Sequence, residues 1–189
     1  FRAILESVES KSGVFSSVLN RYRSERMNIM ALGFPLYIDL NGNNCVVFGG
    51  GEFAADRAQT LLRFGAKVTV IHPTLCPRLR EMDEGGQIRY IPRRYYRGDC
   101  TSAYLCVAAT DDDALNIAIS DECKAKGLPV NVSSPAAFGT FLFPAVVFGD
   151  GLTVSVAGGA PAHLERLRDE LEKALPSLEE AASKPVAED

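Results

Sequence analysis

Residues 45–54 read CVVFGGGEFA, and this stretch decides the fold. Its first four residues are apolar and include two valines, which is typical of a short buried strand. Three glycines follow, and apolar residues then recur at helical spacing as far as Gly65. The pattern G-x-G-x-x-A between a strand and a helix is typical of dinucleotide-binding sites. Gly49 permits the tight turn, Gly51 lets the backbone approach a pyrophosphate, and the helix start supplies free N–H groups. The alternative is that the glycines only shape the turn.

Beyond this stretch, short β-branched runs alternate with amphipathic ones. Strands are expected at residues 45–48, 67–71, 87–91, 103–109 and 129–132, and helices at 51–65, 77–82 and 110–127. This order predicts an α/β fold with a Rossmann-like, doubly wound and largely parallel sheet. The ligand crevice is expected at the carboxyl ends of the strands, from residues 49–54, 72–74 and 108–112.

The segment Ile71-His72-Pro73-Thr74 ends the second strand without the carboxylate that often binds the ribose hydroxyls of NAD. It also has no arginine that would indicate the 2′-phosphate of NADP. Ribose would then be held by backbone groups, by Thr74 or by His72, although His72 is equally well explained as an ordinary turn residue. These residues leave both NAD and NADP open.

A run of carboxylates, Thr110-Asp111-Asp112-Asp113, follows the strand at 103–109. Carboxylates in the first turn of a helix stabilise it by capping and by their interaction with the helix dipole. We assign this stabilising role to Asp112 and Asp113. The N-cap residue at which the helix begins is expected to be Thr110 or Asp111. Asp111 is expected to lie near the site, with the backbone at 109–111 lining the nicotinamide side of the crevice.

The chain changes character after the predicted nucleotide-binding domain, residues 34–134. Residues 135–176 predict an antiparallel hairpin with a Gly-Asp-Gly turn at 149–151, followed by an amphipathic helix that Pro176 ends. A hairpin and one helix make little core alone, so we expect this region to pack on the sheet or to form a dimer interface. Residues 1–33 are expected to form a helical extension, and residues 177–189 a polar tail.

Composition excludes several classes of function. Twenty Lys and Arg against 24 Asp and Glu give a net charge of −4, which argues against general binding of nucleic acid or of anionic membranes. No apolar run approaches the roughly 20 residues that cross a bilayer, and the N-terminal stretch has no signal-peptide core.

The cysteines and histidines predict no metal site. The five cysteines contain no C-x-x-C pair, and the two histidines lie far apart. Cys45 and Cys106 sit in apolar runs, where we expect them to pack as small apolar side chains. Reduced thiols suit a cytoplasmic protein.

An ordered series of stretches resembles the precorrin-2 dehydrogenase/sirohydrochlorin ferrochelatase family, which forms the N-terminal module of bacterial siroheme synthase. These stretches are FPLYIDLNGNNCVVFGGGEFAADRA (34–58), GAKVTVIHP (65–73), YLCVAATDDDALN (104–116), NV (131–132), FLFPAVV (141–147) and LTVSVAGG (152–159). The resemblance implies an NAD-binding domain and an intertwined homodimer. It also implies oxidation of precorrin-2, a tetrapyrrole, to sirohydrochlorin with NAD⁺, and in many members the insertion of ferrous iron.

Matching positions assign residues to the cofactor site. The resemblance gives this role to Gly49, Gly50, Gly51, Glu52, Phe53, Pro73 and Thr74. From their place at the end of a predicted strand, Ala109 and Thr110 are expected to join them.

Three departures from the family pattern bear on catalysis. Ser134 stands where the family has an Asp assigned to proton chemistry, and a hydroxyl needs a neighbouring base to take that role. Asp111 is the candidate substitute. Asp56 stands where a basic residue is usual, and AGGAP (157–161) replaces a serine-rich stretch. We therefore predict an NAD-dependent precorrin-2 dehydrogenase with ferrochelatase activity open. The alternative is a catalytically impaired member that binds NAD or a tetrapyrrole beside a partner enzyme.

Overall fold

The computed structural model describes residues 34–150, 152–158 and 161–182. The predicted helical extension at 1–33 and the end of the predicted tail lie outside the described residues. The described chain divides into two compact units, one of residues 34–143 and the other from Pro144 onward.

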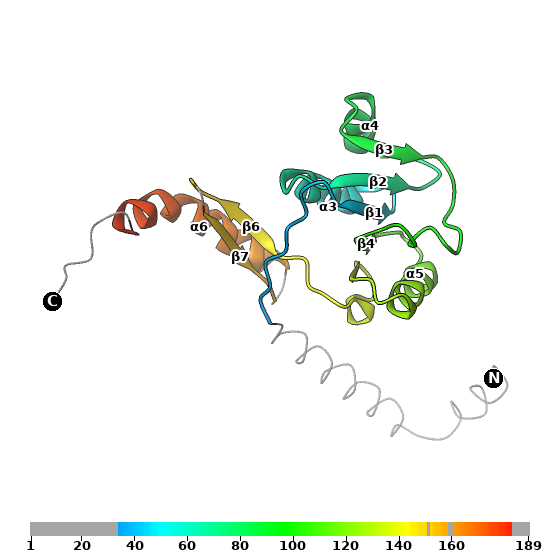
Figure 1. The fold of residues 1–189 in the computed structure, drawn as a ribbon. Helices are drawn as coiled ribbons and strands as arrows, with labels where there is room; N and C mark the ends of the chain where they lie inside the picture. Colours follow the sequence, from blue (N-terminus) through cyan, green and yellow to red (C-terminus); the bar gives the residue numbers. More distant parts are fainter. Residues whose placement is uncertain (1–33, 151, 159–160, 183–189) are drawn as a thin grey trace, which may run out of the picture. The chain divides into compact units, whose positions relative to one another are not determined.

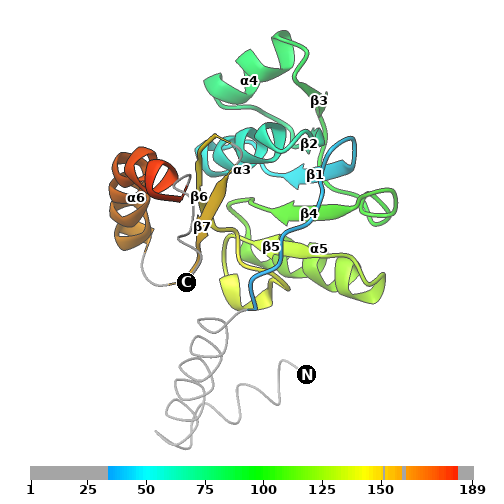
Figure 2. The same ribbon diagram turned by 60° about the vertical axis from the view of Figure 1, so that its left-hand side comes forward.

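The first unit is built on a five-stranded parallel sheet with the order β3-β2-β1-β4-β5 (Figures 1 and 2). Because β1 lies between β2 and β4, the strand order reverses there, and the predicted doubly wound sheet is confirmed. The strands are β1 (Asn44–Phe48), β2 (Lys67–Ile71), β3 (Ile88–Ile91), β4 (Leu105–Ala108) and β5 (Val130–Val132). The helices are α3 (Glu52–Arg63), α4 (Pro77–Glu84), α5 (Asp113–Ala125) and the 3-10 helix η1 (Ala136–Phe138).

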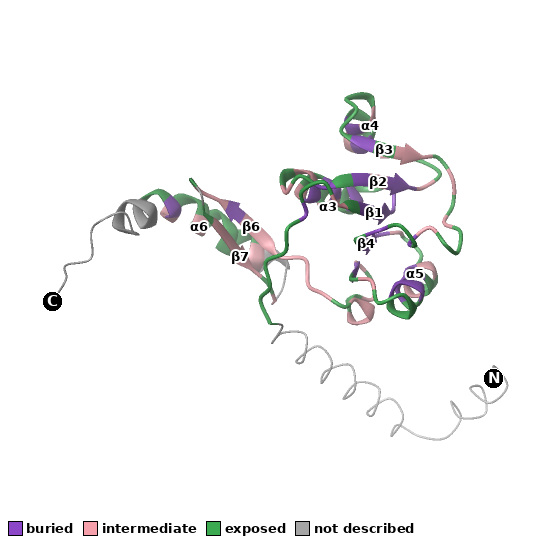
Figure 3. Cartoon of the chain, viewed as in Figure 1, coloured by how far each residue is buried: buried purple, intermediate pink, exposed green. Residues whose placement is uncertain are grey.

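Alternate strand residues bury on opposite faces of this sheet. Val47, Val70 and Val107 belong to a core that α3 and α4 complete. Val46 and Phe48 belong to a second core with α5. In Figure 3 the buried residues run along β1, β2 and β4, and Figure 2 shows α3 near β1. Strands covered on both faces need apolar side chains at every position, which explains their near-continuous apolar runs.

The first unit extends past residue 134, where the sequence suggested its end. The Thr140 N–H donates to Val130 O over 2.7 Å, and Thr140 Oγ1 accepts from the Val130 N–H over 2.8 Å. The Asn131 side chain donates to Phe141 O over 3.1 Å. These bonds fasten the segment after η1 along β5, so it belongs with the sheet.

A long loop joins β3 to β4, and an ion pair shapes it. Arg93 forms two parallel hydrogen bonds with the carboxylate of Asp99, at 2.7 and 2.8 Å. These bonds lower the pKa of Asp99, with a smaller contribution from the Tyr96 N–H. The loop is therefore held in a defined path, which matters because it brings Arg94 and Tyr95 to the ligand crevice.

The second unit contains the predicted hairpin and helix. The antiparallel strands β6 (Ala145–Phe148) and β7 (Thr153–Val156) pair, and α6 (Pro161–Ala182) packs against them. The expectation that Pro176 ends the helix was wrong, because α6 continues to Ala182, so residues 177–182 belong to the helix rather than to the predicted polar tail. A proline removes one backbone donor, and the following Leu, Glu and Ala residues favour helix strongly enough to continue it. None of the helices in the described part of the chain has the length and apolar character needed to cross a bilayer.

Candidate functional site

Two glycines at the carboxyl edge of the sheet allow three loops to meet. The Cys76 N–H donates to Gly50 O over 2.7 Å. A Cβ at Gly50 would lie 1.9 Å from Thr74 O, and one at Gly49 would lie 2.2 Å from Ala109 O. Gly49 also has a φ of 143°, which a residue with a side chain rarely adopts. The loops after β1, β2 and β4 are therefore in backbone contact, and the first two glycines are required by the fold itself.

Gly51 differs from its two neighbours. A Cβ there would meet no atom of the described chain within 4 Å, so packing within the protein does not require a glycine. Gly51 is the N-cap of α3 and makes no side-chain cap, and the Ala55 N–H already bonds to Gly51 O over 3.1 Å. The N–H groups of residues 52–54 face an uncapped helix start. Open space, free donors and the positive end of a helix together fit a pyrophosphate.

A cavity of about 350 Å³ lies beside this turn, between the ends of β2 and β4. His72 and Pro73 line one side, and Thr110 and Asp111 line the other, while Arg94 comes from the loop after β3. In doubly wound sheets the end of the second strand is where the ribose hydroxyls of a dinucleotide bind. Thr110 and Asp111 therefore line the same cavity as the end of β2, and the nicotinamide role predicted for the backbone at 109–111 stays a prediction.

His72 serves the turn after β2. Its Nδ1 lies 2.6 Å from Thr74 O, and this short contact makes Nδ1 the donor. Pro73 O accepts a hydrogen bond from the Tyr90 hydroxyl over 3.0 Å. His72 and Pro73 also line the cavity. Hydrogen bonds within the protein therefore hold this turn in place, and the side of the turn that lines the cavity remains open to a ligand.

Asp112 has the capping role that the sequence predicted for it. Asp112 is the N-cap of α5, and its Oδ1 accepts from the N–H groups of Ala114 and Leu115 over 2.9 and 3.1 Å. Asp113 lies in the first turn. Asp111 is exposed and lines the cavity, and it is not the N-cap of α5.

Asn116 joins the two ends of the crevice and was not singled out from the sequence. It is fully buried, and its Nδ2 donates to Thr110 O over 2.9 Å and to Ser134 O over 3.0 Å. Its Oδ1 accepts from the Thr110 N–H over 3.1 Å and from the Thr110 hydroxyl over 2.8 Å. The available signal was a polar residue on the buried stripe of a predicted helix.

Ser134 lies just after β5, on the other side of β4 from the cavity. It is exposed, and within the described ranges no side chain hydrogen-bonds to its hydroxyl. The structure therefore places Ser134 and Asp111 on different sides of the end of β4, linked through Asn116.

The side chains that follow the glycine turn make contacts within the protein. Arg78 of α4 pairs with Asp56 over 2.7 Å and with Glu52 over 3.3 Å. The hydrogen bond to Asp56 is the main cause of a raised pKa of Arg78. Asp56, where the family resemblance suggested a basic residue, thus joins α3 to α4.

Arg57 stacks between two aromatic rings. Its guanidinium carbon lies 4.3 Å from the centre of the Phe53 ring and 4.4 Å from that of Phe143. Burial lowers the pKa of Arg57, and its buried Nε has no hydrogen-bond partner among the described residues. Phe53, which is predicted to belong to the cofactor site, therefore contacts the positively charged side chain of Arg57 beside the start of α3.

The chain matches a known protein family and is similar to several curated proteins. The pattern of a family described as NAD(P)-binding matches residues 36–145. Siroheme synthase of Nitrosospira multiformis is 39% identical over 148 residues, which are 75% of this chain and 31% of that protein. Siroheme synthase of Chromobacterium violaceum is 35% identical over 146 residues, again 31% of that protein. The chain thus spans about a third of the length of the curated relatives it matches.

Among solved structures, SirC, a precorrin-2 dehydrogenase, matches with a TM-score of 0.62. It is 28% identical to this chain, and the match covers 75% of this chain and 70% of SirC.

The three glycines make a testable contrast. Gly51→Ala should change the free energy of unfolding by about 1 kcal/mol or less, because the added methyl meets open space. It should weaken NAD⁺ binding about tenfold, since the methyl would stand where the pyrophosphate approaches. Gly50→Ala, the matched control, should cost about 1–3 kcal/mol of stability, because its methyl meets the Thr74 carbonyl. Urea unfolding and calorimetric titration with NAD⁺ measure both effects. Unchanged NAD⁺ affinity in Gly51→Ala would contradict the assigned contact.

Proposed function

Because the chain belongs to the NAD(P)-binding family, we propose that it is an NAD-dependent precorrin-2 dehydrogenase acting in siroheme biosynthesis. The observation that carries the proposal is the turn at Gly51. No atom of the described chain lies where a Gly51 side chain would be, and no side chain caps the first N–H groups of α3, so both are available to a ligand. The similarity to siroheme synthases and to SirC supports this substrate.

The reaction removes two electrons and two protons from precorrin-2. When bound, NAD⁺ would supply the hydride acceptor, and the remaining proton would leave to a base or to water. Residues 51–54 would hold the pyrophosphate, and the cavity walls at His72, Pro73 and Thr110 would hold the adenosine ribose. Ser134, on the other side of β4 from this cavity, would then be the residue on the nicotinamide side.

Proton transfer is the step of the reaction for which this chain offers the fewest suitable side chains. The Ser134 hydroxyl has no base beside it among the described side chains, so it can orient a substrate or a water rather than accept a proton. Asp111 lies on the ribose side, which favours a cofactor contact for its carboxylate. Hydride transfer depends mainly on positioning, so we propose slow dehydrogenation with water as the proton acceptor.

Turnover tests the proposal directly. The full chain, given precorrin-2 and NAD⁺, should form NADH and the sirohydrochlorin spectrum faster than a protein-free mixture. Ser134→Asp should raise kcat by about 10²-fold, because a carboxylate at this position can accept the proton. Ser133→Asp, one residue earlier in the chain, serves as the matched control and should not gain activity.

The other outcomes identify the alternatives. Binding of NAD⁺ without turnover in the wild type, with activity appearing in Ser134→Asp, would indicate a catalytically impaired member that binds its ligands beside a partner enzyme. Siroheme formation from sirohydrochlorin and ferrous iron without NAD⁺ would add ferrochelatase activity. Absence of turnover in both proteins would contradict the proposed dehydrogenase.

We propose NAD rather than NADP as the cofactor, because the family that the sequence resembles uses NAD⁺. Arg94 is a feature of the cavity that would favour NADP instead, so it makes the choice testable. Arg94 is exposed and lines the ribose cavity, where an arginine would attract the 2′-phosphate of NADP. Arg94→Ala should leave the KM for NAD⁺ nearly unchanged and raise the KM for NADP⁺ several-fold. A wild-type preference for NADP⁺ that Arg94→Ala reverses would contradict NAD as the cofactor. Arg97→Ala, on the same loop but not lining the cavity, is the control.

We also propose that the second unit pairs two copies of the chain. In its described part, Val147 and Leu175 are the buried apolar side chains, and a hairpin with so little core is rarely stable alone. Sedimentation equilibrium of the full chain should give a dimer mass. Leu167→Glu, an exposed apolar position on α6, should shift the mass toward the monomer, whereas Glu170→Gln should not. A monomeric wild type would contradict the proposal.

All five cysteines are free, which supports a reducing, cytoplasmic location.

A further inference from the structure

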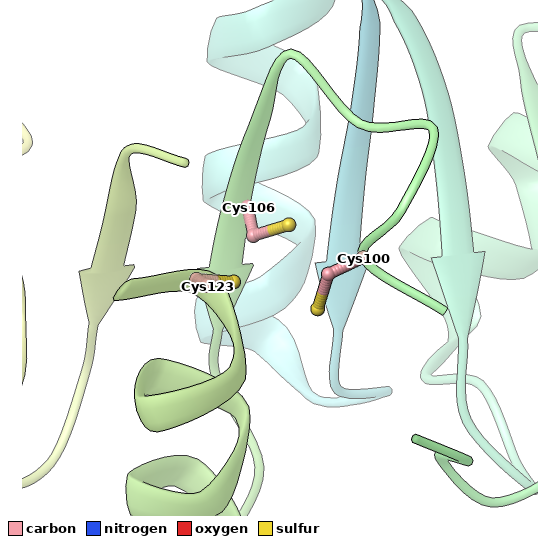
Figure 4. Close-up of side chains that lie close together, drawn as sticks. All are labelled: Cys100, Cys106 and Cys123. Atoms are coloured by element: carbon pink, nitrogen blue, oxygen red, sulfur yellow. The ribbon is translucent and has the colours of Figure 1, made fainter. Parts of the chain in front are cut away.

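Three cysteines meet in the core, where the sequence predicted no metal ligands. Cys100 comes from the loop before β4, Cys106 lies near the start of β4, and Cys123 lies near the end of α5 (Figure 4). Their Sγ atoms all lie within 4.8 Å of one another, and all three residues are fully buried. The spacing along the chain, six and then 17 residues, matches no metal-binding motif, so only the fold brings them together.

The cluster is separate from the proposed cofactor site. Cys106 lies at the amino-terminal end of β4 and Cys123 in the last turn of α5, whereas the glycine turn and the cavity lie at the carboxyl ends of the strands. Its surroundings are apolar and include Val46, Ile119 and Val130. The thiols therefore occupy a dry environment that the dehydrogenase reaction does not use.

Glu122 fixes the cysteines relative to one another. Its carboxylate accepts hydrogen bonds from the Gly98 N–H over 3.0 Å and from the Tyr95 hydroxyl. It also pairs with Lys126 over 3.1 Å. Gly98 and Tyr95 belong to the loop that supplies Cys100, and Glu122 adjoins Cys123 on α5. The loop and the helix are thus fastened together beside the sulfurs, as groups around a metal site commonly are.

We infer that Cys100, Cys106 and Cys123 bind one Cu(I) ion through three sulfur ligands. Metal–thiolate bonds are about 2.3 Å long, so three sulfurs around one ion lie about 4 Å apart. Separations of at most 4.8 Å reach that geometry through small side-chain rotations.

The number and kind of ligands select the metal. Within the described part of the chain, no His, Asp or Glu and no fourth Cys joins the three sulfurs. Zn²⁺ in structural sites almost always has four ligands, and Mg²⁺ and Ca²⁺ require oxygen ligands. Cu(I) is a soft ion that thiolates bind preferentially, and three sulfurs suffice for it in a site without water. On binding, each thiol that becomes a thiolate releases one proton to solvent, and no electron is transferred.

The test is an anaerobic titration of the reduced full chain with Cu(I) in the presence of a competing Cu(I) chelator. One equivalent should bind, and X-ray absorption should show three sulfur neighbours without nitrogen or oxygen. Cys100→Ala, Cys106→Ala and Cys123→Ala should each weaken binding by more than about 100-fold, beyond the usual effect of an outer partner. Cys76→Ala, which changes a half-buried cysteine outside the cluster, should bind as the wild type does.

A second measurement applies if a core variant fails to fold. In urea at which the thiols of the metal-free chain react, Cu(I) should slow the alkylation of Cys100, Cys106 and Cys123, identified by peptide mass, more than that of Cys45, which is equally buried, or of Cys76. Absence of a bound equivalent, equal protection of Cys45 or Cys76, or tight Zn²⁺ binding with a fourth ligand would overturn the inference. Turnover of precorrin-2 is unaffected by these outcomes, so the proposed function stands or fails separately.

Discussion

The close contact between the Gly50 and Thr74 backbones determines how the carboxyl edge of the sheet is built. A side chain at Gly50 would collide with the Thr74 carbonyl at 1.9 Å, so the loops after β1 and β2 can meet only through glycine. Gly49 makes the same approach to Ala109. With both contacts made, the start of α3 lies beside the cavity at the ends of β2 and β4, and one extended ligand can reach both.

The sequence predicted the sheet well because its information is local. Buried parallel strands need apolar residues on both faces. CVVF and LCVA are apolar and buried at every position, and KVTVI is buried at Val68, Val70 and Ile71. Helix starts and turns are also local, as Asp112 and the hairpin show. The end of α6 was mispredicted because a single proline costs one hydrogen bond, which neighbouring helix formers can offset.

Much of the site could not be predicted because it depends on contacts between distant segments. Arg94 follows β3 in the sequence, yet it lines the cavity beyond β2 because the Arg93–Asp99 pair shapes its loop. Asn116 looked like one polar residue in a helix, although its amide is bonded to Thr110 and Ser134. Gly50 and Gly51 are identical in sequence, and only the space around each separates a packing requirement from a ligand contact.

Helix α5 connects the two ends of the sheet. Asn116 and Cys123 are seven residues apart, which is two helical turns, so both point from the same buried stripe. Asn116 fixes the loops at the carboxyl end, while Cys123 and Glu122 hold the loop that leads into β4 at the amino end. That loop also presents Arg94 and Tyr95 to the cavity. The position of one helix therefore determines both the shape of the ribose cavity and the distance between the three sulfurs.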